Sequence, residues 1–257
     1  MAARRTALVT GANQGIGLET CRQLRDLGFA VILTSRDVRA GRAAADELGV
    51  SYHRLDVTKA EDIAALAADL GRDGTKLDVL VNNAAISMDG FNSRVVEGTL
   101  SVNFFGVLNV TEALIPLMND GGTIVMVSSG MGELHAYGDA IRARFAGPRL
   151  TRDQLVALVN EFVAGVAAGN HTRAGWPSSA YRVSKAAVIA LTKIFARDLV
   201  GRRIRVIAAC PGWVRTRMGG RSAPRGVDKG ASSIVWAATD RAAKSGGFYR
   251  DGRVASW

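Results

Sequence analysis

The chain has 257 residues, of which 48% are hydrophobic and 22% charged, a composition typical of one large folded α/β domain and unlike that of a disordered protein. The net charge is +10, but the arginines are scattered over different predicted elements with no basic run among aromatics, so we expect no nucleic-acid partner. No run reaches the roughly 18 uncharged apolar residues of a membrane span and no signal-peptide pattern is found, so we expect a cytoplasmic protein without a membrane partner.

Apolar, strand-like runs alternate with helical stretches along the chain, which is typical of a parallel sheet covered by helices on both faces. The predicted strands are 7–10, 30–34, 52–55, 77–81, 123–127, 204–208 and 248–250, and the predicted helices are 15–27, 39–48, 60–70, 95–114, 181–199 and 229–238. We therefore expect a Rossmann-type, doubly wound α/β fold in a single domain, residues 1–257. Cys21 and Cys210 form no CxxC pair, so we expect reduced thiols and no metal site.

A glycine-rich turn follows the first predicted strand and opens the first helix. Glycines allow a tight turn and a close approach of the backbone to a pyrophosphate, and the helix start aims free N–H groups at it. A ligand-free tight turn is the alternative, but this position in the chain favours a dinucleotide site. The pattern TGxxxGxG, formed by Thr10, Gly11, Gly15 and Gly17, resembles the short-chain dehydrogenase/reductase family. The predicted cofactor residues of this turn are Gly11, Asn13, Gln14, Gly15, Ile16 and Gly17.

The end of the second strand indicates which dinucleotide binds. An acidic residue there favours NAD, because a carboxylate accepts hydrogen bonds from the ribose hydroxyls. This chain has Ser35 followed by Arg36, and a guanidinium binds a 2′-phosphate with charge-assisted hydrogen bonds. Asp37 argues the other way, but we expect it to point away, and Arg39 could assist Arg36. We predict NADPH/NADP⁺ as the cofactor; a solvated surface arginine is the alternative for Arg36.

The family resemblance implies further cofactor residues after the third and fourth strands. Asp56 and Val57 resemble the pair that contacts the adenine. Residues 82–85, Asn-Asn-Ala-Ala, resemble the NNAG motif, and Asn83 and Ala84 are its predicted cofactor contacts. Alanine at position 85 replaces the glycine of the motif, which requires a negative φ there.

A helical insertion is predicted between the fifth strand and the helix at 181–199. Thr151 and Gln154 form a capping-box pattern, after which apolar residues recur at helical spacing from Leu155 to Val166. Gly169 would end this helix. We place the insertion at about residues 132–178.

The pentapeptide Tyr181-Arg182-Val183-Ser184-Lys185 is the most informative one in the chain. Residues four apart share a helix face, so Tyr181 and Lys185 can point into one cleft. A tyrosine with the ordinary pKa of about 10 is a poor acid–base group at neutral pH, and we expect the neighbouring ammonium to lower that pKa. YxxxK alone is common on surface helices, but together with the glycine turn it predicts a catalytic pair.

The resemblance completes the catalytic set with two residues from other elements. It implies that Ser129 hydrogen-bonds the substrate carbonyl oxygen, whereas a serine that merely caps a turn is the alternative. It also implies that Asn103 holds a water that relays protons to the lysine. The predicted catalytic residues are therefore Asn103, Ser129, Tyr181 and Lys185, with Tyr181 as proton donor.

The segment after the sixth strand resembles the PG motif of the family. It implies cofactor contacts from Pro211, Gly212, Val214 and Thr216, besides those from Tyr181 and Lys185. Trp213 would face the substrate together with Ser129 and Tyr181; a core or lid tryptophan is the alternative. We place the substrate loop at about residues 212–228.

The resemblance is strongest to the monomeric carbonyl reductase branch of the family, because it extends to residues 175–181, 210–216 and the final Arg253, Val254 and Trp257. The insertion also matches, since Ser129 and Tyr181 lie 52 positions apart (181 minus 129). We predict a monomeric NADPH-dependent carbonyl reductase that reduces ketones, aldehydes or quinones to alcohols. A dedicated reductase for one secondary-metabolite, terpenoid or steroid carbonyl is the alternative, and a non-catalytic NADP(H)-sensing regulator is a remote one.

Overall fold

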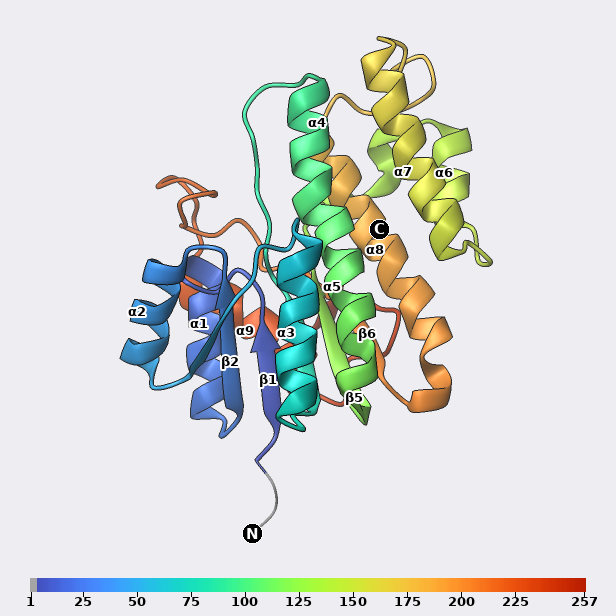
Figure 1. Ribbon diagram of the computed structural model, residues 1–257. Helices are drawn as coiled ribbons and strands as arrows, with labels where there is room; N and C mark the ends of the chain where they lie inside the picture. The colour runs from blue at the N-terminus through green and yellow to red at the C-terminus, as the bar shows by residue number, and fades with distance from the viewer. Residues whose placement is uncertain (1–3) are drawn as a thin grey trace.

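The computed structural model describes residues 4–257, so residues 1–3 of the predicted domain lie outside the described part. One sheet runs through it in the strand order β3-β2-β1-β4-β5-β6-β7-β8 (Figure 1). The strands are β1 (Thr6–Val9), β2 (Ala30–Ser35), β3 (Ser51–Arg54), β4 (Leu77–Asn82), β5 (Met118–Val127), β6 (Arg205–Ala209), β7 (Phe248–Arg250) and β8 (Arg253–Val254). All neighbouring strands pair in parallel except β7 and β8.

Helices cover both faces of this sheet. The helices on one face are α1 (Gly15–Asp26), α2 (Val38–Leu48) and α9 (Val227–Thr239); those on the other are α3 (Ala60–Arg72), α4 (Ser93–Leu100), α5 (Val107–Leu114) and α8 (Ala180–Asp198). The strand order reverses between β1 and β4, where ligands bind in folds of this kind. The predicted Rossmann-type, doubly wound sheet is confirmed.

The sequence of β4 explains why the strand can be buried on both sides. Leu80 packs in the apolar cluster under α3, α5 and α8, whereas Val79 and Val81 pack in the cluster under α1 and α9. Successive side chains of a strand point to opposite faces, so the central residues of a strand that is covered on both sides are apolar in succession, as 79–81 are here. The carboxyl end of β4 is therefore held between two buried apolar clusters.

The insertion between β5 and α8 contains α6 (Asp139–Ala146) and α7 (Arg152–Ala167), which Figure 1 shows together at one end of the molecule. The predicted capping box is confirmed, because Thr151 and Gln154 bond each other's backbone N–H groups. Gly169 follows α7 with a φ of +68°, as expected for a helix stop. α7 packs on both α4 and α8. Four aromatic rings pack on one another and join α6 and α7 to the segment that precedes α8; they belong to Tyr137, Phe145, Phe162 and Trp176.

The single long helix predicted over 95–114 is interrupted in the structure. Between α4 and α5 lies a π-helical turn, η1 (Ser101–Gly106), and the 3₁₀ turn η2 (Ile115–Leu117) ends the segment. Within the described residues, Ser93–Leu117 is the one helical segment apolar and long enough to cross a membrane. Half of its most apolar stretch is buried, and it packs against α3 and α8, as a core helix does.

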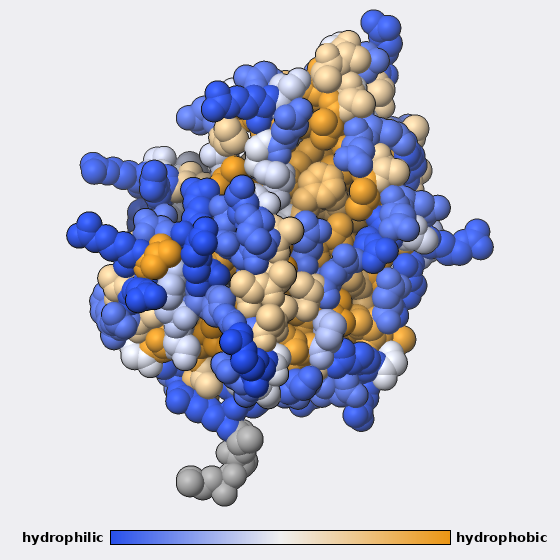
Figure 2. Space-filling model, viewed as in Figure 1, coloured by the Kyte–Doolittle hydropathy of each residue, from blue (hydrophilic) through white to orange (hydrophobic). Residues whose placement is uncertain are grey.

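Figure 2 shows the molecular face that carries α3, α4 and α5. Hydrophilic residues cover most of it, and hydrophobic residues lie mainly in a band over the α4–α5 helix and beside it. The crevice at the carboxyl edge of the sheet lies between the turns that follow β1, β4, β5 and β6.

Candidate active site

The turns after β1 and β4 hold each other in place. The Thr10 hydroxyl accepts hydrogen bonds from the backbone N–H groups of Asn83 and Ala84, both at 3.0 Å. In return, the Asn83 side-chain amide donates to the carbonyls of Thr10 (2.8 Å) and Gly11 (3.0 Å). Gly11 has a φ of +62°, and a Cβ there would lie 2.8 Å from the Ala84 Cα. Only glycine fits at this position, because both the conformation and the close approach exclude a side chain.

The N-terminus of α1 is open toward this turn. Its N-cap residue, Gln14, makes no side-chain cap, and no acidic residue lies in the first helical turn. By contrast, Asp37 caps α2 and Ser179 caps α8. The free N–H groups and the positive end of the helix dipole therefore suit an anionic group such as a pyrophosphate.

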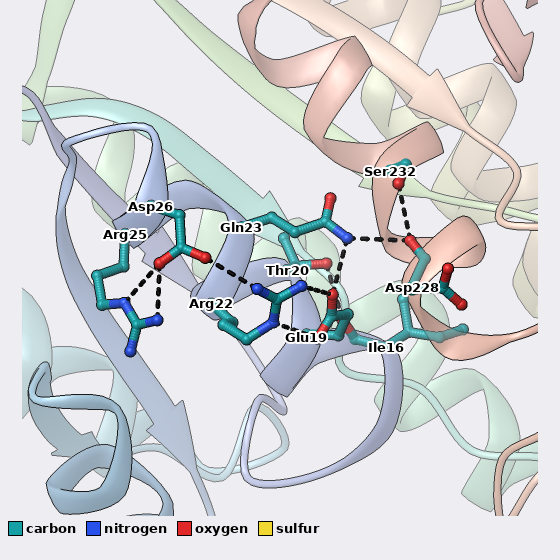
Figure 3. A network of polar contacts seen from close by, with 9 residues as sticks. All are labelled: Ile16, Glu19, Thr20, Arg22, Gln23, Arg25, Asp26, Asp228 and Ser232. Atoms are coloured by element: carbon teal, nitrogen blue, oxygen red, sulfur yellow. Dashed lines mark hydrogen bonds and ion pairs between the residues drawn. The ribbon is translucent and has the colours of Figure 1, made fainter.

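Polar contacts hold α1 against α9, as Figure 3 shows. Gln23 donates hydrogen bonds to the Glu19 carboxylate (2.9 Å) and to the carbonyl of Asp228 at the start of α9 (3.0 Å). The Glu19 carboxylate also pairs with Arg22, so the charges of this surface neutralise one another.

A cavity of about 290 Å³, the cofactor cavity, extends from Arg36 past the glycine turn to Tyr181 and Lys185. Every predicted cofactor residue lines it except Gly212 and Val214, which line a neighbouring cavity. An elongated cavity with an anion-binding helix start in its middle fits a dinucleotide.

Arg36 and Asp37 lie as the sequence predicts. The Asp37 carboxylate accepts a hydrogen bond from the Ala40 N–H at 2.9 Å and so points into the start of α2, away from the cavity. Arg36 is exposed at the cavity and, within residues 4–257, pairs with no carboxylate. Burial favours a higher pKa for Asp56, but hydrogen bonds from Thr58 and the charge of Arg36 hold this pKa below its usual value. Asp56 is thus an anion close to Arg36.

The φ required at position 85 is also observed. Among the described non-glycine residues, positive φ values occur at Arg203 and Asp251 alone, so Ala85 adopts a negative φ. Alanine can therefore replace the glycine of the motif without strain.

Tyr181 and Lys185 lie one turn apart at the start of α8 and face the same crevice. The Lys185 Nζ lies 5.5 Å from the centroid of the Tyr181 ring and donates a hydrogen bond to the Val127 carbonyl at 2.9 Å. Lys185 is 3% exposed and lines the cofactor cavity. The structure therefore brings the predicted phenol and ammonium together.

The predicted lowering of the Tyr181 pKa is wrong for this structure. Burial raises the pKa of Tyr181 to about 12, and a hydrogen bond with Ser129 offsets only part of that rise. Burial also lowers the pKa of Lys185 to about 8, because an ammonium loses its hydration there. The phenol consequently keeps its proton at neutral pH, which is the form that a proton donor needs.

Asn103 lies in the π-helical turn and is fully buried. Its side-chain oxygen accepts a hydrogen bond from the Ile86 N–H at 2.8 Å, and its NH₂ group donates to the Ile86 carbonyl (2.9 Å) and to the Ser184 hydroxyl (3.2 Å). The amide thus joins η1, the turn after β4 and α8. A π turn is often found at functional sites because it redirects one side chain from the regular helix, and the sequence pattern did not reveal it.

The turn after β5 packs tightly on α8. Ser128 donates a hydrogen bond to the Lys185 carbonyl at 3.0 Å, and the Ser129 hydroxyl accepts one from the Met131 N–H at 3.2 Å. Gly132, which we did not predict, allows this contact: a Cβ there would lie 2.8 Å from the Lys185 carbonyl carbon. This glycine therefore determines how closely Ser129 approaches α8.

A second cavity, of about 640 Å³, adjoins the first; we call it the substrate cavity. Ser129, Tyr181 and Trp213 line it, as predicted for substrate residues. Trp213 is 58% exposed and donates a hydrogen bond to the Gly219 carbonyl at 2.9 Å, so it is part of a loop wall and not of the core. Three exposed methionines also line it, Met88, Met131 and Met218, of which Met218 lies in the predicted substrate loop and Met88 lies outside every predicted segment.

The substrate loop also reaches the cofactor cavity. A Cβ on Gly15 would lie 3.6 Å from the Thr216 methyl, so this loop passes next to the start of α1. Arg217 and Met218 line the cofactor cavity beside it. Arg217 was not among the predicted residues, because no motif includes it.

Comparison with known proteins gives consistent matches over nearly the whole chain. Residues 5–141 match the family described as short chain dehydrogenase, and residues 154–246 match one described as enoyl-(acyl carrier protein) reductase. Carbonyl reductase (NADPH) 1 from Sus scrofa is 40% identical over 272 residues, covering 98% of this chain and 94% of that protein. Salutaridine reductase from Papaver somniferum has a TM-score of 0.89 and 31% identity, covering 96% of this chain and 100% of that one. Menthone neomenthol reductase from Mentha piperita has a TM-score of 0.84 and 29% identity, covering 97% and 99%.

Proposed function

This chain belongs to the short-chain dehydrogenase/reductase family, and we propose that it reduces ketones, aldehydes or quinones to alcohols with NADPH. The curated relatives named for this activity and the fold both support an NADPH-dependent oxidoreductase acting on a small-molecule carbonyl compound. The observation that carries the proposal is the position of Tyr181. Among the described residues, it is the one ionisable side chain that lines both cavities.

The residues of the cofactor cavity fit NADPH. The open start of α1 would hold the pyrophosphate, and Arg36 would bind the 2′-phosphate. Asp56 and Val57 would contact the adenine, and Lys185 the nicotinamide ribose. NADPH would supply the hydride that adds to the carbonyl carbon.

The residues of the protein would supply the proton that the carbonyl oxygen needs. Tyr181 donates its phenolic proton to the carbonyl oxygen, which Ser129 holds by a hydrogen bond. The donation leaves a phenolate, and the Lys185 ammonium one helical turn away stabilises it. Because burial makes a bare phenolate unfavourable here, this ammonium contributes most when the proton leaves. Asn103 supports the arrangement by fixing η1 to α8 through Ser184.

Replacing the proton donor tests this assignment. We expect Tyr181→Phe to lower kcat by about 10²–10⁴-fold, the usual contribution of a positioned acid, while the Kd for NADPH changes little. Turnover is followed by NADPH oxidation with menadione and with an aromatic aldehyde, and the Kd by NADPH fluorescence. Turnover near that of the wild type would assign the proton donor to another group.

We also propose that the protein is a cytoplasmic monomer without a nucleic-acid partner. The packing of α7 on α4 and α8 supports the monomer, because the insertion covers part of a helical face that could otherwise pair with a second copy. Both cysteines are free and buried, which suits a reducing compartment. The three statements are tested separately: the monomer by light scattering after gel filtration, the cytoplasmic location by imaging of a tagged chain, and the absence of a nucleic-acid partner by a DNA-binding titration.

A further inference from the structure

The wall of the substrate cavity combines apolar side chains and hydroxyl groups and carries little charge. Its lining contains large apolar side chains, among them Met88, Met131, Met218 and Trp213, and a single charged side chain, Arg250, with no carboxylate. Tyr181 and Ser129 occupy the part of the wall next to the cofactor cavity. A substrate whose carbonyl reaches Tyr181 therefore meets one positive charge elsewhere in the same cavity.

The register of the sheet directs Arg250 to the catalytic face. Phe248 packs with Ile189 of α8, whereas Tyr249 packs on the opposite face against Trp236 of α9. Since successive strand residues alternate between faces, Arg250 shares the face of Phe248, on which α8 and its catalytic residues lie. It is also the last residue of β7, at the carboxyl edge of the sheet.

The guanidinium of Arg250 is free to bind a ligand. The adjacent carboxylate, Asp251, already pairs with Arg225, with 3.0 Å between Nη1 and Oδ2. Within residues 4–257, Arg250 makes no ion pair and no side-chain hydrogen bond, and it is exposed at the cavity. A guanidinium recognises a carboxylate through two parallel charge-assisted hydrogen bonds.

We propose that the preferred substrates are apolar carbonyl compounds that carry a carboxylate at some distance from the carbonyl, and that Arg250 selects them. Methionine side chains adapt to different apolar shapes, so they would accept varied carbon skeletons. Arg250 would then add selectivity for one charged end. This inference rests on the proposed carbonyl reductase function and specifies which carbonyl compounds it favours.

A matched pair of substrates tests the inference: 5-oxo-5-phenylpentanoate and its methyl ester, which share the phenyl ketone and differ in charge. We expect the wild-type enzyme to have the higher kcat/KM for the acid. Arg250→Gln should lower the acid-to-ester ratio of kcat/KM by about 5- to 10-fold, mainly through the KM for the acid. Arg250→Lys should retain part of the ratio, and added salt should reduce the ratio in the wild type because the charge is exposed.

Arg253→Gln is the matched control. Arg253 lies opposite Arg250 in the β7–β8 pair and is exposed, but it lines neither cavity. Its substitution by glutamine removes the same charge as Arg250→Gln. We expect this variant to keep the wild-type acid-to-ester ratio. An unchanged ratio in Arg250→Gln, or an equal fall in both variants, would overturn the role of Arg250. Failure of the proposed function gives a different result, because then neither the acid nor the ester would oxidise NADPH.

Discussion

Replacing Gly132 by alanine should disturb the catalytic geometry through a single methyl group. The new Cβ would lie 2.8 Å from the Lys185 carbonyl carbon, whereas ordinary contacts begin at 3.4 Å, so the turn and α8 must separate by about 0.6 Å (3.4 minus 2.8). The three nearest atoms, the carbonyl carbon and oxygen of Lys185 and the nitrogen of Ala186, all belong to the backbone, which cannot rotate away. Overpacking of this kind costs about 1–3 kcal/mol, and about 2 kcal/mol would lower the Tm of a chain of this size by about 4–8 °C.

The same displacement should reduce activity, because Ser129 and Lys185 lie on the two segments that are pushed apart. A misplacement of 1 Å can cost about 10²-fold in rate, so we expect kcat/KM to fall by about 10-fold. Calorimetry gives the Tm, and NADPH oxidation gives the rate.

Gly130→Ala is the matched control for stability. It lies in the same turn, but its Cβ would meet nothing closer than the Glu133 side chain at 3.8 Å. We expect its Tm to stay within about 1 °C of the wild-type value. If Gly132→Ala had the same Tm and the same rate as the wild type, the close contact between the turn and α8 would not control the site.

Three further predictions concern charge. Arg36→Ala should raise the Kd for NADPH by about 10- to 100-fold, which corresponds to the loss of a charge-assisted hydrogen bond, and should leave the Kd for NADH nearly unchanged. Equal increases in the two Kd values, measured by fluorescence titration, would contradict this prediction. Arg217→Ala should raise the Kd for both NADPH and NADH by about 5-fold, since Arg217 lies beside the start of α1. Arg221 is on the same loop but lines neither cavity, so Arg221→Ala should leave both Kd values unchanged. Between pH 8 and 10 the unfolded chain retains a proton that folded Lys185, with a pKa of about 8, has lost. In urea unfolding, the free energy of unfolding of the wild type should therefore rise relative to that of Lys185→Met by about 2–3 kcal/mol across that window. A difference between the two proteins that does not change with pH would refute this prediction.

Short-range signals in the sequence were sufficient for the cofactor turn and the tyrosine–lysine pair. Both depend on fixed spacings, a glycine pattern after a strand and residues four apart on a helix. The capping box of Thr151 and Gln154 is equally local, and it was confirmed. The strand boundaries shifted where polar residues continue a strand, as at Met118, where β5 begins five residues before the predicted 123.

Features that depend on packing were not predictable. α6 has just two buried apolar residues, Ile141 and Phe145, among arginines, so its helical period is faint. The π turn at Asn103 lies within a continuous apolar pattern that reads as one helix. The pKa of Tyr181 follows from how deeply the fold buries the phenol, and a sequence spacing says nothing about that depth.

The loop that follows β6 has a consequence for engineering. Pro211, Thr216 and Met218 border the cofactor cavity on one side and the substrate cavity on the other. Substitutions at these three positions would change coenzyme affinity and substrate choice together, so the two effects could not be selected apart. Met88 and Met131 lie outside this loop and border the substrate cavity alone. Redesign of selectivity should begin there, where a new side chain can reshape one compartment without loosening the other.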